Sequence, residues 1–225
     1  MRAPRLLVPI AAACLLTACA SGTAVESAAP STSSGAAAEF APTDSERDPT
    51  TRIPGVLAVE YGEVEHVLAT RRVAYDHAPP LGGNHDPSWA QCDGVVYDVA
   101  VRSENLVHSM EHGAVWISYN PDQVTGAELD ALARRVTDQP YMVMSPYPDQ
   151  DKPVSVQAWG RQLKVDSVDD PRIDQFTTAT RTNPYLSPEP GASCGSVDPR
   201  LFDVDNPRPF DPAPYGPDAI PVTGS

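Results

Sequence analysis

The sequence predicts a small α/β (α+β) domain, a sandwich built on a mixed β-sheet, with disordered segments at both ends. Residues 53–195 lie between two regions poor in large apolar side chains and have the usual length of one domain. Within them, apolar runs of strand length alternate with helical patterns in the order β-α-β-β-α. A thioredoxin-like fold uses this order, as do other mixed-sheet folds, and no redox motif selects among them.

The first half of the domain is expected to contain an extended segment, a rigid loop and a short helix. Residues 65–73 suit an extended conformation, and prolines and glycines make residues 78–92 a turn-rich loop. Residues 103–112 predict a helix, because Ser103 suits an N-cap and Gly113 can end the helix.

The second half is expected to supply most of the sheet. Residues 114–119, 141–145 and 154–163 are rich in strand-forming apolar residues. Residues 171–180 predict a helix whose first residue is proline, which is common at that position. Residues 123–136 predict an amphipathic helix, because apolar side chains recur at helical spacing: Val124, Ala127, Leu129, Leu132, Ala133 and Val136.

The first 18 residues have the pattern of a lipoprotein signal peptide. Arg2 and Arg5 precede an apolar run, residues 6–16, that is too short to span a membrane. Residues 16–19, Leu-Thr-Ala-Cys, resemble the lipobox of bacterial lipoproteins, which implies cleavage before Cys19 and lipid on its sulfur. The alternative is an ordinary signal peptide beside a chance cysteine. We expect acyl chains such as palmitate to anchor the protein at the extracytoplasmic face of the cell membrane.

The amino-acid composition predicts where the folded domain begins and ends. Residues 19–52 are rich in small and polar side chains and predict a flexible tether, which leaves residues 53–195 as the globular extracytoplasmic domain. Seven prolines in residues 196–225 predict a disordered tail without a regular helix or a paired strand.

The chain is strongly acidic. Its formal charge of −14 becomes −16 when Arg2 and Arg5 are removed with the signal peptide. This charge argues against nucleic acid as a partner and against electrostatic binding to anionic lipid. The acyl anchor must therefore hold the protein at the membrane, and an envelope protein partner is left unspecified.

Two of the four cysteines belong to the folded part. Cys14 and Cys19 lie in the export signal, so Cys92 and Cys194 remain and are expected to pair in an oxidising compartment. Their loop of about one hundred residues would contribute roughly 4 to 5 kcal/mol. Metal thiolates or a redox pair are the alternatives, although no Cys-x-x-Cys motif is present.

The segment from His108 to His112 is the clearest candidate for a functional site. On a helix, Leu106 and Met110 face one side, whereas His108, Glu111 and His112 face the other. Histidines four residues apart can bind one divalent metal, and the glutamate between them can bind the ion, orient a histidine or activate a water. The alternative is a solvated polar face.

The other histidines lie upstream. His85 stands in a loop stiffened by prolines, where it is a third ligand or a side chain that locks the loop. His66 and His77 are weaker candidates. Three methionines have soft sulfur atoms that suit copper, but they stand at apolar positions where core packing is preferred: Met110, Met142 and Met144.

Four parts of the folded region carry distinctive motifs: residues 79–85 with Trp89 and Cys92, residues 104–113, residues 145–148 and residues 158–160. In this order they resemble the bacterial domain of unknown function 3105 family. The resemblance covers about residues 64–194 and implies a secreted or membrane-attached extracytoplasmic domain without an established activity. A leucine is usual in that family at the place of Met110, which weakens a methionine-ligand role.

Three functional hypotheses follow. The first is a non-enzymatic metal-binding domain with His85, His108 and His112 as ligands and Glu111 as a ligand or as a partner of one, for which copper or zinc suits imidazole best. The second is an envelope interaction module without metal. The third is a metal-dependent hydrolase, in which the His-x-x-Glu-His motif uses Glu111 as the base.

Overall fold

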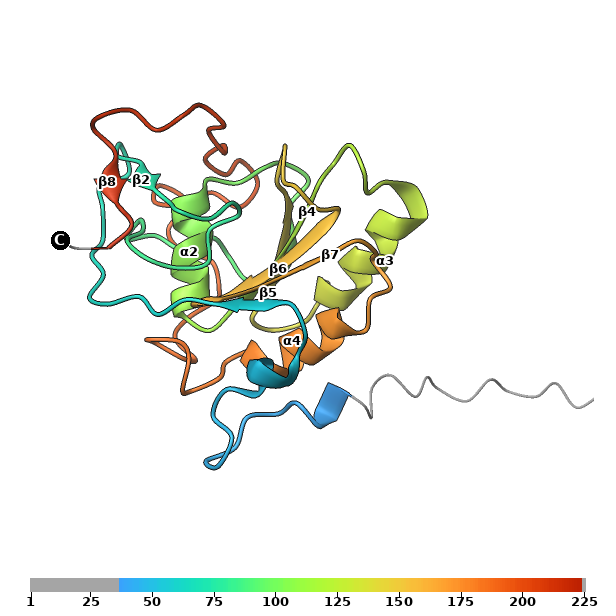
Figure 1. Ribbon diagram of the computed structural model, residues 1–225. Coiled ribbons are helices and arrows are strands. Elements are labelled where there is room, and N and C mark those ends of the chain that lie inside the picture. Colours follow the sequence, from blue (N-terminus) through green and yellow to red (C-terminus); the bar gives the residue numbers. More distant parts are fainter. Residues whose placement is uncertain (1–36, 224–225) are drawn as a thin grey trace, which may run out of the picture. The chain divides into compact units, whose positions relative to one another are not determined.

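A six-stranded mixed sheet organises residues 37–223, the part of the chain that the computed structural model describes (Figure 1). The strand order is β1-β7-β6-β4-β5-β3. The central strand β4 runs parallel to β5 and antiparallel to β6. The strands are β1 (Val56–Ala58), β3 (Asp93–Val96), β4 (Val115–Tyr119), β5 (Met142–Pro146), β6 (Val154–Ala158) and β7 (Arg161–Val165).

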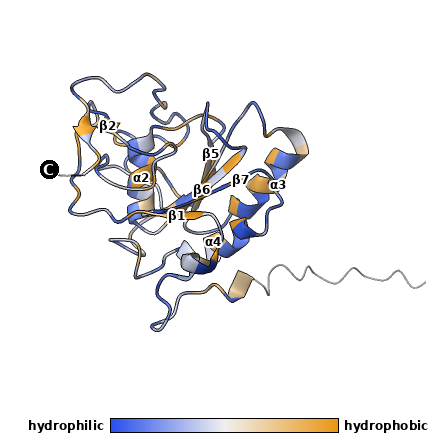
Figure 2. Cartoon of the chain, viewed as in Figure 1, coloured by the Kyte–Doolittle hydropathy of each residue, from blue (hydrophilic) through white to orange (hydrophobic). Residues whose placement is uncertain are grey.

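Helices cover both faces of this sheet. Figure 1 shows α2 (Ser103–Glu111) on one side, and α3 (Gly126–Val136) and α4 (Arg172–Thr180) on the other. In Figure 2, α3 and α4 each combine hydrophobic and hydrophilic residues, as helices covering a sheet do. Within residues 37–223, no helix is both long enough and apolar enough to cross a bilayer. The predicted α+β domain with a mixed sheet is confirmed. From β4 onward the order is β-α-β-β-β-α, which has one strand more than predicted.

Strand alternation divides the core into two clusters. Val115 and Ile117 of β4 pack in the cluster that contains α3 and α4, whereas Trp116 packs with α2. Met142 belongs to the first cluster and Met110 to the second, and both are fully buried. The methionines therefore fill the core, as expected from their apolar positions.

Three local predictions differ from the structure. The single strand predicted over residues 154–163 is a hairpin, because the chain turns at Gly160, where φ is +68° and an added Cβ would lie 2.4 Å from the carbonyl oxygen of Val59. Ser103 is the first helical residue of α2 rather than its N-cap. Helix α3 begins at Gly126 instead of at residue 123, and Val124 is buried just before it.

The folded part starts earlier than predicted. Residues 37–52, assigned to the tether, include the 3-10 helix η1 (Pro49–Arg52), and Phe40 packs against the core. The amide of Asn183 donates to the carbonyl of Arg47 at 2.9 Å, which ties this segment to the end of α4. Residues 37–52 can fold with few large apolar side chains of their own, because the domain supplies the residues that they contact. The predicted signal peptide, residues 1–18, and Cys19 lie outside the described residues.

The proline-rich C-terminal segment, residues 196–223, lies against the domain, so the prediction of a disordered tail without paired strands is wrong there. Its strand β8 (Ile220–Pro221) pairs in parallel with β2 (Val73–Ala74). Prolines lack N–H donors but keep their carbonyls, and the domain supplies donors to this segment. The Arg72 side chain donates to the carbonyls of Asp211 and Ala213, each at 2.8 Å.

A buried charge network joins the start of α2 to the loop before it. Arg102 pairs with both Asp86 and Glu104, and all three side chains are nearly inaccessible to solvent. Glu104 also accepts a hydrogen bond from the backbone N–H of Val73 at 2.9 Å. Each buried carboxylate therefore has a cationic partner, as burial of charge requires.

The predicted disulfide between Cys92 and Cys194 is confirmed. Their Cα atoms are 4.8 Å apart and 102 residues separate them in sequence. The backbone N–H of Cys92 also donates to the carbonyl of Cys194 at 2.9 Å. The bond therefore fixes the end of the 78–92 loop to the start of the C-terminal segment.

Replacing both Cys92 and Cys194 by serine is expected to lower the free energy of unfolding by about 4 to 5 kcal/mol, because the unfolded chain loses a loop constraint of this length. Urea titration of the full chain, followed by tryptophan fluorescence, measures the change. Reduction of the wild-type chain should shift the midpoint in the same direction. An unchanged midpoint in both experiments would contradict a stabilising role.

Arg102→Met is expected to destabilise the fold by about 3 to 5 kcal/mol, because it leaves the buried Glu104 without a cation and leaves Asp86 only the more distant Arg208, at 3.9 Å. The matched control is Arg200→Met, which removes an 88% exposed side chain from an ion pair with Asp198 and should leave the urea midpoint unchanged. Equal midpoints for the two variants would show that the buried network adds nothing to stability.

Candidate metal centre

The polar face of α2 is buried. His108, Glu111 and His112 are only 4%, 7% and 3% exposed, and the opposite face packs Leu106 and Met110 into the core. When a short helix is buried on all sides, its polar side chains need hydrogen-bond partners from the surrounding protein. The predicted two-sided helix is therefore present, but its polar side faces protein rather than solvent.

The loop that carries His85 runs along this helix. The backbone N–H of Ala90 donates to the carbonyl of Asn105 at 3.0 Å, and the Ser109 hydroxyl donates to the carbonyl of Ala90 at 2.6 Å. At Gly83, where φ is +100°, an added Cβ would lie 2.4 Å from the carbonyl oxygen of Val222. The glycine lets the C-terminal segment close over the loop, and this packing fixes His85, which is fully buried.

His66 lies beside His85 because their backbones pair. The N–H of Val67 donates to the carbonyl of His85 at 2.7 Å, and the N–H of His85 donates to the carbonyl of Glu65 at 3.2 Å. The two imidazole rings have centroids 5.0 Å apart. His66, a weak candidate in the sequence, is thus brought to the polar face of α2.

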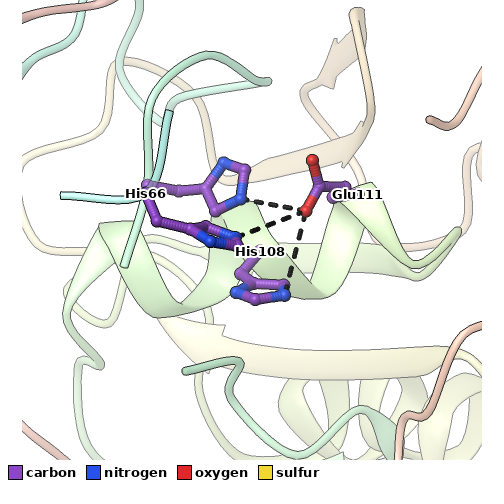
Figure 3. A group of neighbouring side chains, drawn as sticks. His66, His108 and Glu111 are labelled. Atoms are coloured by element: carbon purple, nitrogen blue, oxygen red, sulfur yellow. Dashed lines mark hydrogen bonds and ion pairs between the residues drawn. The ribbon is translucent and has the colours of Figure 1, made fainter. Parts of the chain in front are cut away.

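Four ligand atoms converge at this face. One nitrogen each of His66, His85 and His108 and one oxygen of Glu111 all lie within 4.8 Å of one another. Glu111 Oε2 is 3.0 Å from His85 Nε2, 3.8 Å from His108 Nε2 and 3.9 Å from His66 Nε2. Figure 3 shows these contacts meeting at a single carboxylate oxygen. Such a group could hold a metal ion.

His112 belongs to a neighbouring group. Its Nε2 lies 3.0 Å from His108 Nε2 and 3.7 Å from Glu189 Oε2, and it forms a second set of candidate ligands with Glu111 and Glu189. The structure therefore brings the predicted ligands His85, His108 and Glu111 together with His66 and places His112 next to them. His77 instead pairs with Asp76.

Backbone carbonyls fix the tautomer of the three buried histidines. The Nδ1 atoms of His85, His108 and His112 lie 2.8, 2.7 and 2.6 Å from the carbonyl oxygens of Gly83, Asp86 and Ser193. A carbonyl oxygen can only accept, so each Nδ1 must carry the proton and donate. In the neutral ring the lone pair is then on Nε2, the atom directed at the cluster.

The cluster contains no permanent cation. Burial lowers the pKa of His108 to about 3, so its ring is neutral at physiological pH. Burial also acts to raise the pKa of Glu111, but the neighbouring imidazoles, His85 first, outweigh it and keep that pKa below its usual value. Within residues 37–223, Glu111 forms ion pairs only with histidines.

Aromatic rings enclose the inner side of the cluster, and His66 leaves its outer side accessible. The ring centroid of Trp89 lies 5.5 Å from that of His108, and the centroid of Trp159 lies 5.9 Å from that of His85. The side chain of His66 is 52% exposed, in contrast to the nearly inaccessible His85. An ion could reach the cluster from the side of His66.

Sequence reasoning ranked His66 only as a weak candidate and did not assign Glu189 as a ligand. His66 reaches the cluster because its backbone pairs with that of His85. Glu189 reaches it because residues 187–194 fold over the end of α2. The one available signal was that all five histidines fall between His66 and His112.

Residues 66–196 match the protein family described as "Protein of unknown function (DUF3105)". No curated protein and no solved structure matches the chain. The family match covers more than half of the 225 residues and includes every residue of both ligand groups. The chain therefore belongs to the DUF3105 family, as its sequence motifs indicated.

Proposed function

We propose that this chain is an extracytoplasmic, lipid-anchored metal-binding protein whose folded domain holds a copper or zinc ion through His66, His85, His108 and Glu111. The observation that carries the proposal is the convergence of the Nε2 lone pairs of His85 and His108, whose Nδ1 atoms donate to carbonyls, on the carboxylate of Glu111, with His66 beside them. A transition-metal cation satisfies all of these atoms at once.

The donor count supports this conclusion. The Nδ1 protons of His85 and His108 are used by carbonyl oxygens, so both Nε2 atoms are acceptors in the neutral rings, and they face the acceptor Glu111 Oε2. Buried acceptors that face one another without a donor are costly. Histidines that served only to lock the loop would need their carbonyl contacts but not this convergence.

The donor atoms favour Zn²⁺ or Cu²⁺. Imidazole nitrogen suits both ions, and a carboxylate completes a set of four. Soft sulfur donors are not available among the described residues, because Cys92 and Cys194 are oxidised to a disulfide and the methionine Met110 packs in the core. This argues against a thioether or thiolate site for Cu⁺.

The position of Glu111 favours binding over hydrolysis. In the hydrolase hypothesis, this glutamate would act as a base on a metal-bound water. Here its Oε2 lies within 3.9 Å of a ring nitrogen of each of the three histidines, which suits a ligand. The cluster is thus better built to hold an ion than to keep a free base beside it.

The full chain, prepared without a histidine tag and exposed to Zn²⁺ or Cu²⁺, should retain at least one equivalent by elemental analysis after gel filtration. His85→Gln and His108→Gln should weaken binding by at least the roughly 100-fold that loss of an outer-shell partner costs. His77→Gln is the matched control and should bind as the wild type does, because His77 lies outside both groups.

Circular dichroism confirms that each variant is folded before its affinity is compared. A folded wild-type chain that retains no metal at micromolar concentrations would refute the metal-binding function. Equal binding by wild type and a folded His108→Gln variant would refute the site.

Export and lipid anchoring rest on the first residues of the sequence. The charged start, the short apolar run and the residues before Cys19 support processing as a lipoprotein. The Cys92–Cys194 disulfide supports an oxidising compartment outside the cytoplasm. The acidic chain, with its net charge of −14, supports attachment through lipid rather than through charge.

Cys19→Ser should move the protein from the membrane fraction to the soluble fraction of cells that express the full chain, because the acyl anchor is lost. Incorporation of labelled palmitate should disappear in parallel. Cys14→Ser is the matched control and should leave both measurements unchanged. Membrane retention by the Cys19→Ser variant would contradict the anchor.

A further inference from the structure

The geometry points to a second divalent cation beside the first, held by His112 and Glu189, with Glu111 as a carboxylate that bridges the two ions. This inference rests on the proposed function, because it assumes that the first group holds a metal. It extends the single centre to a pair of ions at the C-terminal end of α2.

The second group has its own ligand set. Ligand atoms of Glu111, His112 and Glu189 all lie within 4.8 Å of one another. Glu111 is the one member shared with the group of His66, His85 and His108. A carboxylate has two oxygens, and a residue shared by two ligand sets can give one oxygen to each ion.

The two oxygens of Glu111 are used differently. The closest approaches of Glu111 to His85, His66 and His108 all involve Oε2. Within the part of the chain that the structure describes, Oε1 makes no hydrogen bond. Oε1 is therefore the oxygen that remains for an ion on the side of His112.

A single ion leaves the acceptor at His112 unsatisfied. The Nδ1 of His112 donates to the carbonyl of Ser193, so its Nε2 carries a lone pair, and it lies 3.0 Å from the His108 Nε2 that the first ion uses. Glu189 Oε2 brings a negative charge to 3.7 Å from the same nitrogen. A cation between them satisfies this pair of acceptors and also offsets the charge of Glu189.

The backbone holds Glu189 in place. Its N–H donates to the carbonyl of Glu111 at 3.1 Å, and the N–H of Gly191 donates to the carbonyl of His112 at 3.0 Å. The segment that carries Glu189 is thus attached to the last turn of α2, where the helix dipole favours a cation. The side chain of Glu189 is 60% exposed, so this ion lies nearer to solvent and should bind more weakly than the first.

The test is a titration of the metal-free full chain with Zn²⁺, followed by isothermal calorimetry and elemental analysis. Wild type should bind two equivalents, the second at least ten-fold more weakly. Glu189→Gln should bind one equivalent with the affinity of the first step unchanged. Glu128→Gln is the matched control, because Glu128 is exposed and is the one other glutamate after His112 in the sequence.

Cu²⁺ gives an independent readout. Carboxylate-bridged ions in two-metal sites are about 4 Å apart, so two Cu²⁺ ions should show magnetic interaction in the electron paramagnetic resonance spectrum of wild type. The Glu189→Gln spectrum should be that of an isolated Cu²⁺ ion.

The outcomes separate the two proposals. One equivalent in the wild type would refute the second ion and leave the metal-binding function intact, with His112 as an extra ligand of one centre or as none. Two equivalents in Glu189→Gln would refute the ligand assignment. No bound metal in the wild type would refute the proposed function itself.

Discussion

A buried carboxylate without a permanent cationic partner is the constraint on which the centre depends. Glu111 is 7% exposed and, within residues 37–223, forms ion pairs only with imidazoles. Two of them, His85 and His108, direct their Nδ1 protons to carbonyls. Glu104, two turns earlier on the same face of α2, differs from Glu111 because Arg102 neutralises its carboxylate. The fold therefore provides an arginine where it needs stability and leaves a negative site where a cation can bind.

The scaffold brings chain segments that are distant in sequence to one short helix. The loop around His85 covers one side of α2, and residues 187–194 cover its C-terminal end, where the Ser193 carbonyl accepts from His112. The Cys92–Cys194 disulfide joins the His85 loop to residues 187–194, and Cys194 directly follows Ser193. The covalent bond thus stabilises the outer contacts that orient the ligands as well as the fold.

The features that depend on local periodicity or on the number of cysteines could be predicted from the sequence. The features that depend on pairing between distant segments could not. The face carrying His108 and Glu111 follows from helical spacing, and the disulfide follows from the two cysteines left in the domain. His66 and Glu189 could not be assigned, because each reaches the site through backbone pairing that no local pattern encodes. The proline-rich tail was misjudged for the same reason, since its donors come from arginines far away in the sequence.

The contact between β8 and the His85 loop links the order of synthesis to assembly of the centre. The carbonyl of Val222 accepts from the N–H of Asn84 at 2.6 Å, and Gly83 packs against Val222 in the same place. The loop beside His85 is therefore completed by a segment that lies far downstream in the sequence. In a chain made from its N-terminus onward, His85 cannot take its final position until residue 222 has been added and has folded back, so the buried histidine cluster forms only after the proline-rich segment has docked.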